Sequence, residues 1–127
     1  MRTNFSSGSP WEASVGYSRA VRVGNSIEVA GTTAMDGDIL KGKGDLYAQT
    51  VFIFQKIEKV LIEAGASLQD IVRTRMYVTD ISQWELAGKA HAEFFSNIKP
   101  AATMVEVSAL ISEDLLIEIE VSAIINK

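Results

Sequence analysis

The sequence predicts an α+β domain in which two helices cover one face of a mixed β-sheet. Two stretches repeat apolar residues at helical spacing, and five others alternate apolar and polar residues as strands do. Their order is strand, strand, helix, strand, helix, strand, strand, which is typical of helices packed on a sheet. The 127 residues suffice for one core, so we predict a single domain over 1–127.

The predicted elements begin with a hairpin. Residues 1–14 are polar and predict a loose N-terminal arm. The strand-like segments 18–23 and 26–32 follow, separated by Gly24-Asn25, which has the length and composition of a β-hairpin turn. Residues 33–45 hold several glycines among charged residues, so we expect a flexible loop at the edge of a cleft.

A long helix is predicted next. Residues 46–64 carry apolar side chains at helical spacing, and Gly65 stands where a helix normally ends. A strand rich in β-branched and aromatic residues follows at 71–79. Ser82 and Glu85 have the spacing of a capping box, which predicts a second helix that continues to about residue 96.

Two strands, 101–110 and 116–125, end the chain. Side chains of a strand alternate between the two sheet faces, and one face of the last strand is wholly apolar. We expect that face under the helices, together with Ile27, Val29, Val72, Met76, Val78, Val105 and Val107.

The opposite face is predicted to carry Glu28, Arg73, Arg75, Tyr77, Ala102, Met104, Glu106, Glu118, Glu120 and Ser122. Two interpretations of this face stay open. It is either exposed to solvent, as is common for antiparallel sheets, or an interface between subunits whose charges pair across chains.

Composition excludes several classes of function. The chain has 12 basic and 16 acidic residues, so its net charge of −4 makes nucleic acid an improbable partner. Without cysteine there are no disulfides or thiolate ligands, and a single histidine cannot hold a metal alone, so we expect neither metal nor cofactor. No apolar leader or membrane-length apolar run is present, which favours a cytoplasmic protein.

Ordered motifs over most of the chain resemble the RidA/YjgF family, also called the endoribonuclease L-PSP family. Gly16-Tyr17-Ser18 resembles its Gly-Pro-Tyr-Ser opening, and Val29-Ala30-Gly31 resembles its Val-Ser-Gly. Phe94-Phe95 matches its Phe-Phe. The C-terminal stretch 99–122, KPAATMVEVSALISEDLLIEIEVS, resembles its signature of Pro-Ala-Arg-Ser/Thr, Val-Glu-Val and Ile-Glu-Ile-Glu.

The resemblance implies a chorismate-mutase-like fold and a homotrimer with ligand clefts between neighbouring subunits. It also implies hydrolytic deamination of reactive imines or enamines, in which Glu118 positions the attacking water and Tyr17 orients the substrate. Gly31 matches the family's cleft glycine. Ala102 stands in place of the arginine that binds a substrate carboxylate, and Gly88 in place of an asparagine. Alanine cannot form the bidentate pair of an arginine, so the substrate need not be a 2-iminoacid.

The remaining candidates for substrate binding are Arg19, His91 and Met104. Arg19 lies two residues beyond Tyr17. It either supplies the positive charge that is missing from the cleft because Ala102 replaces the arginine, or is a surface residue paired with Glu12 or Glu28. His91 lies on an apolar helical stripe, where it is either a hydrogen-bonded residue at the core edge or a general acid/base. Met104 is predicted on the face that carries Glu118.

Three functions follow from these observations. The first is a trimer that handles a small metabolite, a carboxylate or an imine, and deaminates it with Glu118 and Tyr17 as catalytic residues. The second is a ligand-binding trimer without catalysis. The third is the ribonuclease activity in the family's older name, against which the negative net charge and the single histidine argue.

Overall fold

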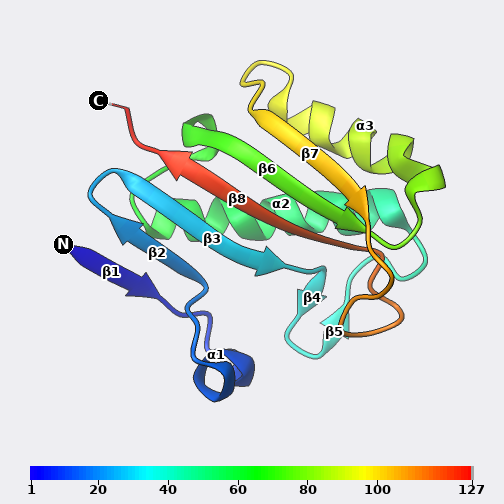
Figure 1. Cartoon of the computed structure of the whole chain (residues 1–127), viewed down its shortest axis with the longest axis horizontal. Helices are drawn as coiled ribbons and strands as arrows, with labels where there is room; N and C mark the ends of the chain where they lie inside the picture. The colour runs from blue at the N-terminus through cyan, green and yellow to red at the C-terminus, as the bar shows by residue number, and fades with distance from the viewer. Residues whose placement is uncertain (127) are drawn as a thin grey trace.

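Six strands form one mixed sheet, and two long helices cover one of its faces (Figure 1). In the computed structural model, which describes residues 1–126, the strand order is β1-β2-β3-β8-β6-β7. Neighbouring strands are antiparallel, except that β6 and β7 are parallel. The strands are β1 (Arg2–Phe5), β2 (Ala20–Val23), β3 (Ser26–Thr32), β6 (Ile71–Val78), β7 (Ala101–Glu106) and β8 (Ile117–Ile124), and the long helices are α2 (Leu46–Glu63) and α3 (Trp84–Phe95). The predicted α+β class is confirmed.

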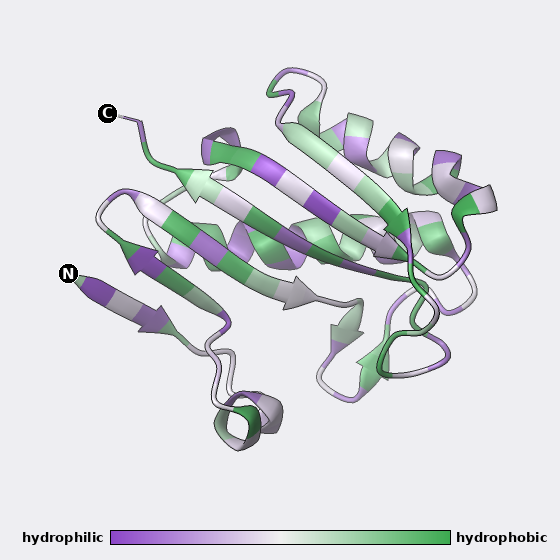
Figure 2. Cartoon of the chain, viewed as in Figure 1, coloured by the Kyte–Doolittle hydropathy of each residue, from purple (hydrophilic) through white to green (hydrophobic). Residues whose placement is uncertain are grey.

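The core lies between the sheet and the helices. Hydrophobic and hydrophilic residues alternate along β3 and β6, as Figure 2 shows, and every apolar residue of β8 from Ile117 to Ala123 is buried. Phe54 of α2 is fully buried and packs edge-to-face against Phe95 of α3. The predicted helix-facing side of the last strand is therefore confirmed.

Strand β7 presents its faces opposite to the prediction. Met104 pairs with Met76, which is buried under the helices, and Met104 itself packs on the core. Val105 instead pairs with Tyr77 and is 42% exposed on the other face. Residues 101–105 are apolar or small on both sides, so alternation alone could not assign the faces of this edge strand. Glu106, its last residue, pairs with buried Val78.

The prediction for Val72 and the length of two strands also change. The register between β6 and β8 shifts between Ile71 and Arg73, so Ile71 is buried and Val72 is 43% exposed. A bulge of this kind adds a residue to one strand and reverses the alternation beyond it. β7 ends at Glu106, short of the predicted residue 110.

The N-terminal segment is ordered, contrary to the predicted loose arm. β1 pairs with β2 at the sheet edge, and the short helix α1 (Pro10–Val15) follows. Glu12 of α1 is only 6% exposed, and its carboxylate accepts hydrogen bonds from the hydroxyls of Ser6 and Ser7 and from the Ser7 backbone N–H. These contacts involve residues close in sequence, but the pairing of β1 depends on a strand some 18 residues away, which local composition cannot reveal.

The loop before α2 contains a small hairpin, β4 (Met35–Asp36) and β5 (Ile39–Leu40). Lys56 of α2 fixes the beginning of this loop, because its Nζ donates hydrogen bonds to the carbonyls of Thr33 and Met35 at 2.9 and 2.7 Å. The predicted mobile loop is therefore tied to the helix layer.

The helix ends are set by side chains. Asp45 caps α2 by accepting from the Ala48 N–H, and the chain leaves the helix at Gly65, whose φ of 90° suits glycine. The predicted Ser82–Glu85 capping box is wrong. A 3₁₀ turn, η2 (Ile81–Gln83), precedes α3, and Asp80 accepts from the backbone and hydroxyl of Ser82. A capping box instead opens the turn η1 (Leu68–Asp70).

None of the helices in the described part of the chain is both long and apolar enough to span a membrane.

Candidate functional site

Glu118 and Gly31 meet where β3 is irregular. The register between β3 and β8 shifts between Val29 and Thr32, and Gly31 lies inside this bulge. A Cβ atom placed on Gly31 would lie 2.0 Å from Oε2 of Glu118, so the carboxylate occupies the space that a side chain would need. Bulges often redirect side chains next to functional sites.

The environment of Glu118 shifts its acidity. Burial of the half-buried carboxyl raises its pKa, the positive charge of Arg19 lowers the pKa in part, and the neighbouring Glu120 raises it. The net effect is a pKa above the ordinary value of 4.5. A carboxylate whose pKa moves toward neutrality is suited to take and return a proton, which is the requirement for a general base.

Arg19 contacts both Gly31 and Tyr17. Its Nη2 donates to the Gly31 carbonyl at 2.9 Å, and its guanidinium carbon lies 5.7 Å from the centre of the Tyr17 ring. Nε is buried and has no hydrogen-bond partner among residues 1–126. The charge of Arg19 also lowers the pKa of Glu12, whereas Glu28 accepts from Ser122.

Tyr17 opens onto a hollow of about 400 Å³ on the sheet face that the helices leave free. Tyr17 is 38% exposed. Besides Tyr17, the hollow is lined by Arg2, Asn4, Gly16, Ser18, Val21, Glu28, Val29, Ala30 and Glu120. Arg2 and Asn4 were missed by the sequence analysis, because no local pattern marked residues 2–5 as a strand beside the site.

Glu120, rather than Glu118, is tied into the polar network of this face. It pairs with Arg75 at 3.7 Å and accepts a hydrogen bond from the Tyr77 hydroxyl at 2.9 Å. Glu118 is absent from the hydrogen bonds and ion pairs found among residues 1–126. The two glutamates therefore differ, because Arg75 and Tyr77 hold the Glu120 carboxylate and no such contact holds that of Glu118 among the described residues.

A second group of candidates lies on the other side of the sheet, where α3 packs on β6 and β7. Nε2 of His91 is 2.9 Å from the Thr74 hydroxyl, and Ala102 pairs with Thr74. Burial lowers the pKa of His91. The Trp84 ring packs beside Gly88, 3.6 Å from where a Cβ on Gly88 would lie, and is 53% exposed.

The structure thus divides the predicted site into two groups. Tyr17, Arg19, Gly31 and Glu118 gather around the β3 bulge. Gly88, His91, Ala102 and Met104 lie at the junction of α3 and β7, with Ala102 and Met104 paired to buried residues of β6. Among residues 1–126, the hollow beside Tyr17 is lined by none of the second group.

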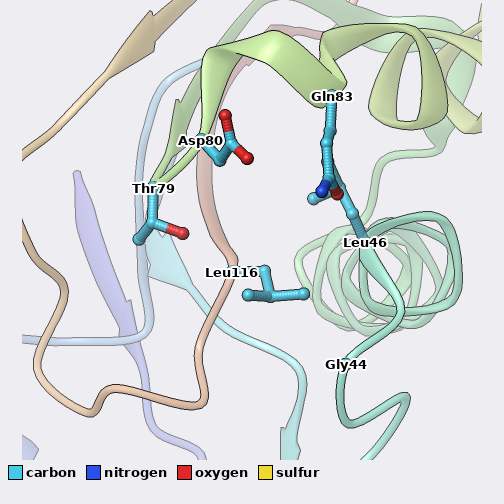
Figure 3. Close-up of a pocket in the computed structure, with 6 residues that line it drawn as sticks. All are labelled: Gly44, Leu46, Thr79, Asp80, Gln83 and Leu116. Carbon is cyan, nitrogen blue, oxygen red and sulfur yellow. The ribbon is translucent and has the colours of Figure 1, made fainter.

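A smaller hollow of about 180 Å³ lies between the start of α2 and the turn before α3 (Figure 3). Thr79 and Asp80 lie on one side of it, and Gln83 and Leu46 on the other. None of the predicted site residues lines this hollow.

Comparison with known proteins supports the motif analysis. The sequence profile of the family described as "Endoribonuclease L-PSP" matches residues 8–125. The chain belongs to this family, also called RidA/YjgF.

Relatives within the RidA/YjgF family cover most of the chain. An uncharacterised protein of Streptomyces coelicolor is 39% identical over 92% of this chain and 87% of its own length. The 3-aminoacrylate deaminase RutC of Acinetobacter baylyi is 31% identical over 81% of this chain and 82% of its own length.

Solved RidA/YjgF structures confirm the fold. A Mycobacterium tuberculosis protein described as a member of the YjgF/YER057c/UK114 family is 52% identical, with a TM-score of 0.89 over 98% of this chain and 100% of the other. RidA from an Antarctic Psychrobacter is 30% identical, with a TM-score of 0.78 over 86% of this chain and 88% of the other. The chorismate-mutase-like, RidA-like fold predicted from the motifs is therefore confirmed.

Proposed function

We propose that this RidA/YjgF member forms a homotrimer that binds a small metabolite in clefts between its subunits and hydrolyses the C=N bond of an imine, or of an enamine through its imine form. The observation that carries the proposal is the half-buried Glu118 carboxylate, which lies against Gly31 with its pKa raised by burial. Such a group can accept a proton from water near neutral pH.

The chemistry needs one water and releases one ammonia. As the water oxygen bonds to the imine carbon, Glu118 takes a proton from the water and the imine nitrogen takes a proton from its surroundings. The carbinolamine then collapses: protonated Glu118 gives its proton to the leaving nitrogen, the hydroxyl group loses its proton to the surroundings, its oxygen forms the C=O bond, and the C–N bond breaks to release ammonia. Tyr17, exposed at the edge of the bulge site, orients the substrate in this scheme.

A trimer is favoured by the division of the candidate residues. The group around Glu118 and the group around Ala102 lie apart in one chain, and a cleft between subunits would place one copy's first group beside its neighbour's second. Light scattering on the purified protein is expected to give three times the chain mass of 13.8 kDa at micromolar concentration. A mass of 13.8 kDa would overturn this assembly.

The second group restricts the choice of substrate. Ala102 and Gly88 offer no side-chain hydrogen bond, so on that side the cleft would lack the paired donors with which an arginine binds a substrate carboxylate. The proposed substrates are therefore small imines that need no carboxylate contact at Ala102. The 31% identical relative named 3-aminoacrylate deaminase supports the reaction class.

The test is ammonia release from imines generated in the assay, with neutral and carboxylate-bearing side chains compared. Glu118→Gln removes the base but keeps the shape, and we expect roughly 100-fold or greater loss of rate. Glu113→Gln is the matched control, because Glu113 is an exposed loop residue with no hydrogen bond or ion pair to the described residues. Equal rates for the Glu118 and Glu113 variants would remove the catalytic proposal.

The alternative is a trimer that binds a metabolite without converting it. It is favoured by the loss of both polar side chains at Ala102 and Gly88. In that case a carbonyl or imine analogue would bind, as calorimetry can measure, while no imine would release ammonia faster than in buffer.

A further inference from the structure

Arg19 and Glu118 approach the same residue, Gly31, from two directions. Nη2 of Arg19 holds the Gly31 carbonyl at 2.9 Å, and the Glu118 carboxylate fills the space beside the Gly31 Cα. The position of Gly31 therefore decides where the carboxylate can lie, and Arg19 is the side chain that bonds to Gly31.

The bulged segment receives further support from the helix layer. The register of β3 shifts between Val29 and Thr32, so regular strand pairing does not hold this stretch. Just beyond it, Lys56 of α2 donates to the carbonyls of Thr33 and Met35. Two cations from different elements thus hold the carbonyls of residues 31, 33 and 35.

The orientation of the guanidinium argues against a bond to substrate through its most useful edge. Nε and Nη2 form one edge of the planar group, and this edge can grip a carboxylate with two parallel hydrogen bonds. In Arg19, Nη2 is engaged by Gly31 and Nε is buried. Because Nη2 is already bonded and Nε is closed to solvent, this edge is not free to bind a substrate carboxylate.

We propose that Arg19 is a positioning residue, which holds the bulge at Gly31 in the place against which Glu118 packs, rather than the residue that binds the substrate. The inference rests on the proposed role of Glu118 as the base. The positive charge of Arg19 has a second effect. Burial and the neighbouring Glu120 raise the pKa of Glu118, and Arg19 opposes them by lowering it. Tyr77, which pairs with Glu118 across β6 and β8, is the other titratable group facing it.

The experiment compares Arg19→Gln and Arg19→Lys with the unchanged protein in two measurements. The first is a carbon NMR titration of the glutamate carboxyl groups without substrate, in which the signal of Glu118 is identified by its loss in Glu118→Gln. We expect Arg19→Gln to raise the pKa of Glu118, because a positive charge is removed, and Arg19→Lys to leave it closer to its original value. Arg73→Gln, which removes an arginine outside the groups facing Glu118, is the control and should leave this titration unchanged.

The second measurement is the pH profile of imine hydrolysis. We expect Arg19→Gln to lower kcat roughly tenfold, to shift the acidic limb to higher pH and to change KM less than about twofold, with partial rescue in Arg19→Lys. An increase in KM with kcat and the acidic limb unchanged would show that Arg19 binds substrate and would overturn the inference.

The two measurements can contradict the proposed function and the role of Arg19 independently of each other. If no variant releases ammonia, the proposed function is wrong, but the titration still tests whether Arg19 acts on Glu118. If the Glu118 titration is the same in Arg19→Gln as in the unchanged protein, the inference is wrong even if the enzyme is active.

Discussion

The carboxylate of Glu118 lies so close to Gly31 that a methyl group on Gly31 would stand 2.0 Å from Oε2. Gly31 does not have the left-handed φ found at Gly16, Gly24 or Gly65, so its backbone does not require glycine. The requirement is space for the acid. A glycine in β3 and a glutamate in β8 therefore act as a pair, and the one cannot change without moving the other.

The first prediction concerns Gly31→Ala. The added methyl group must displace the Glu118 carboxylate, which is the flexible partner, so the fold should survive and the proposed base should move. We expect ammonia release to fall by about 100-fold, the loss that a misplacement near 1 Å can cause. Melting by circular dichroism should show a folded protein.

The matched control for the stability measurement is Gly88→Ala. A Cβ on Gly88 would lie 3.6 Å from the Trp84 ring, an ordinary contact, and alanine is favoured over glycine inside a helix by roughly 1 kcal/mol. This variant should melt at or above the original temperature. Full activity in Gly31→Ala would show that the position of the Glu118 carboxylate is unimportant.

The second prediction is that Glu118→Gln stabilises the protein at neutral pH. Burial raises the pKa of Glu118, so the folded state binds the proton more tightly than the unfolded state does. The stabilisation from this proton is complete below about pH 4.5 and is lost as the pH rises through the raised pKa. At pH 7 the buried, ionised carboxylate destabilises the folded state, and the neutral glutamine side chain avoids this cost.

Melting temperatures from pH 4 to pH 8 measure this effect. The difference between Glu118→Gln and the unchanged protein should grow with pH and be smallest at the acid end. Glu113→Gln, at an exposed loop position, should show no such trend. If the difference in melting temperature between Glu118→Gln and the unchanged protein were the same at every pH, Glu118 would have the same pKa in the folded and unfolded states, which would contradict the prediction.

The strongest local patterns were sufficient to predict the interior elements. The helix predicted at 46–64 is observed at Leu46–Glu63, and the strand predicted at 26–32 is observed at Ser26–Thr32, because periodicity, caps and turn residues agree there. The edge strands were not predictable in the same way. β1 has no apolar pattern and depends on pairing with β2, and β7 is apolar on both faces, so its orientation depends on pairing with β6.

The site was predictable only in part for the same reason. Motif matches identified Tyr17, Gly31 and Glu118, and the first two are joined through Arg19 while Glu118 packs on Gly31. Met104 was placed on the wrong face, since one residue of register moves a side chain to the other side of the sheet. The hollow beside Asn4 could not be foreseen, because it exists only when β1 is docked.

The third prediction concerns Glu12, which orders the segment leading to Tyr17. Burial raises its pKa, but hydrogen bonds from Ser7 and Ser6 outweigh burial and leave the pKa lowered, with a further contribution from Arg19. Its stabilisation is therefore present above about pH 4.5 and is lost as the pH falls through the lowered pKa. We expect Glu12→Ala to lower the free energy of unfolding at pH 7 by about 1–3 kcal/mol.

Thermal melts and limited proteolysis test the role of Glu12. Cleavage in residues 1–15 should become faster in Glu12→Ala, whereas Ser14→Ala, which loses one long exposed hydrogen bond of 3.4 Å, should behave like the unchanged protein. Identical melting and cleavage in Glu12→Ala and Ser14→Ala would show that β1 and α1 hold without the carboxylate.

The fourth prediction uses His91, the chain's single histidine, as a marker of acid sensitivity. Its ring is packed between Phe54 and Phe95, and burial lowers its pKa below the ordinary 6.5. The unfolded chain therefore binds the proton more readily, so stability should be constant above about pH 6.5 and decrease as the pH falls below it. In His91→Gln this part of the pH dependence should disappear, because glutamine keeps a partner for the Thr74 hydroxyl but does not titrate.

Loss of ring packing will lower the melting temperature of the variant by a constant amount, so the informative quantity is the slope of melting temperature against pH between pH 7.5 and pH 5.5. Since no other imidazole exists in the chain, equal slopes in the two proteins would mean that His91 is protonated in the folded state as easily as in water.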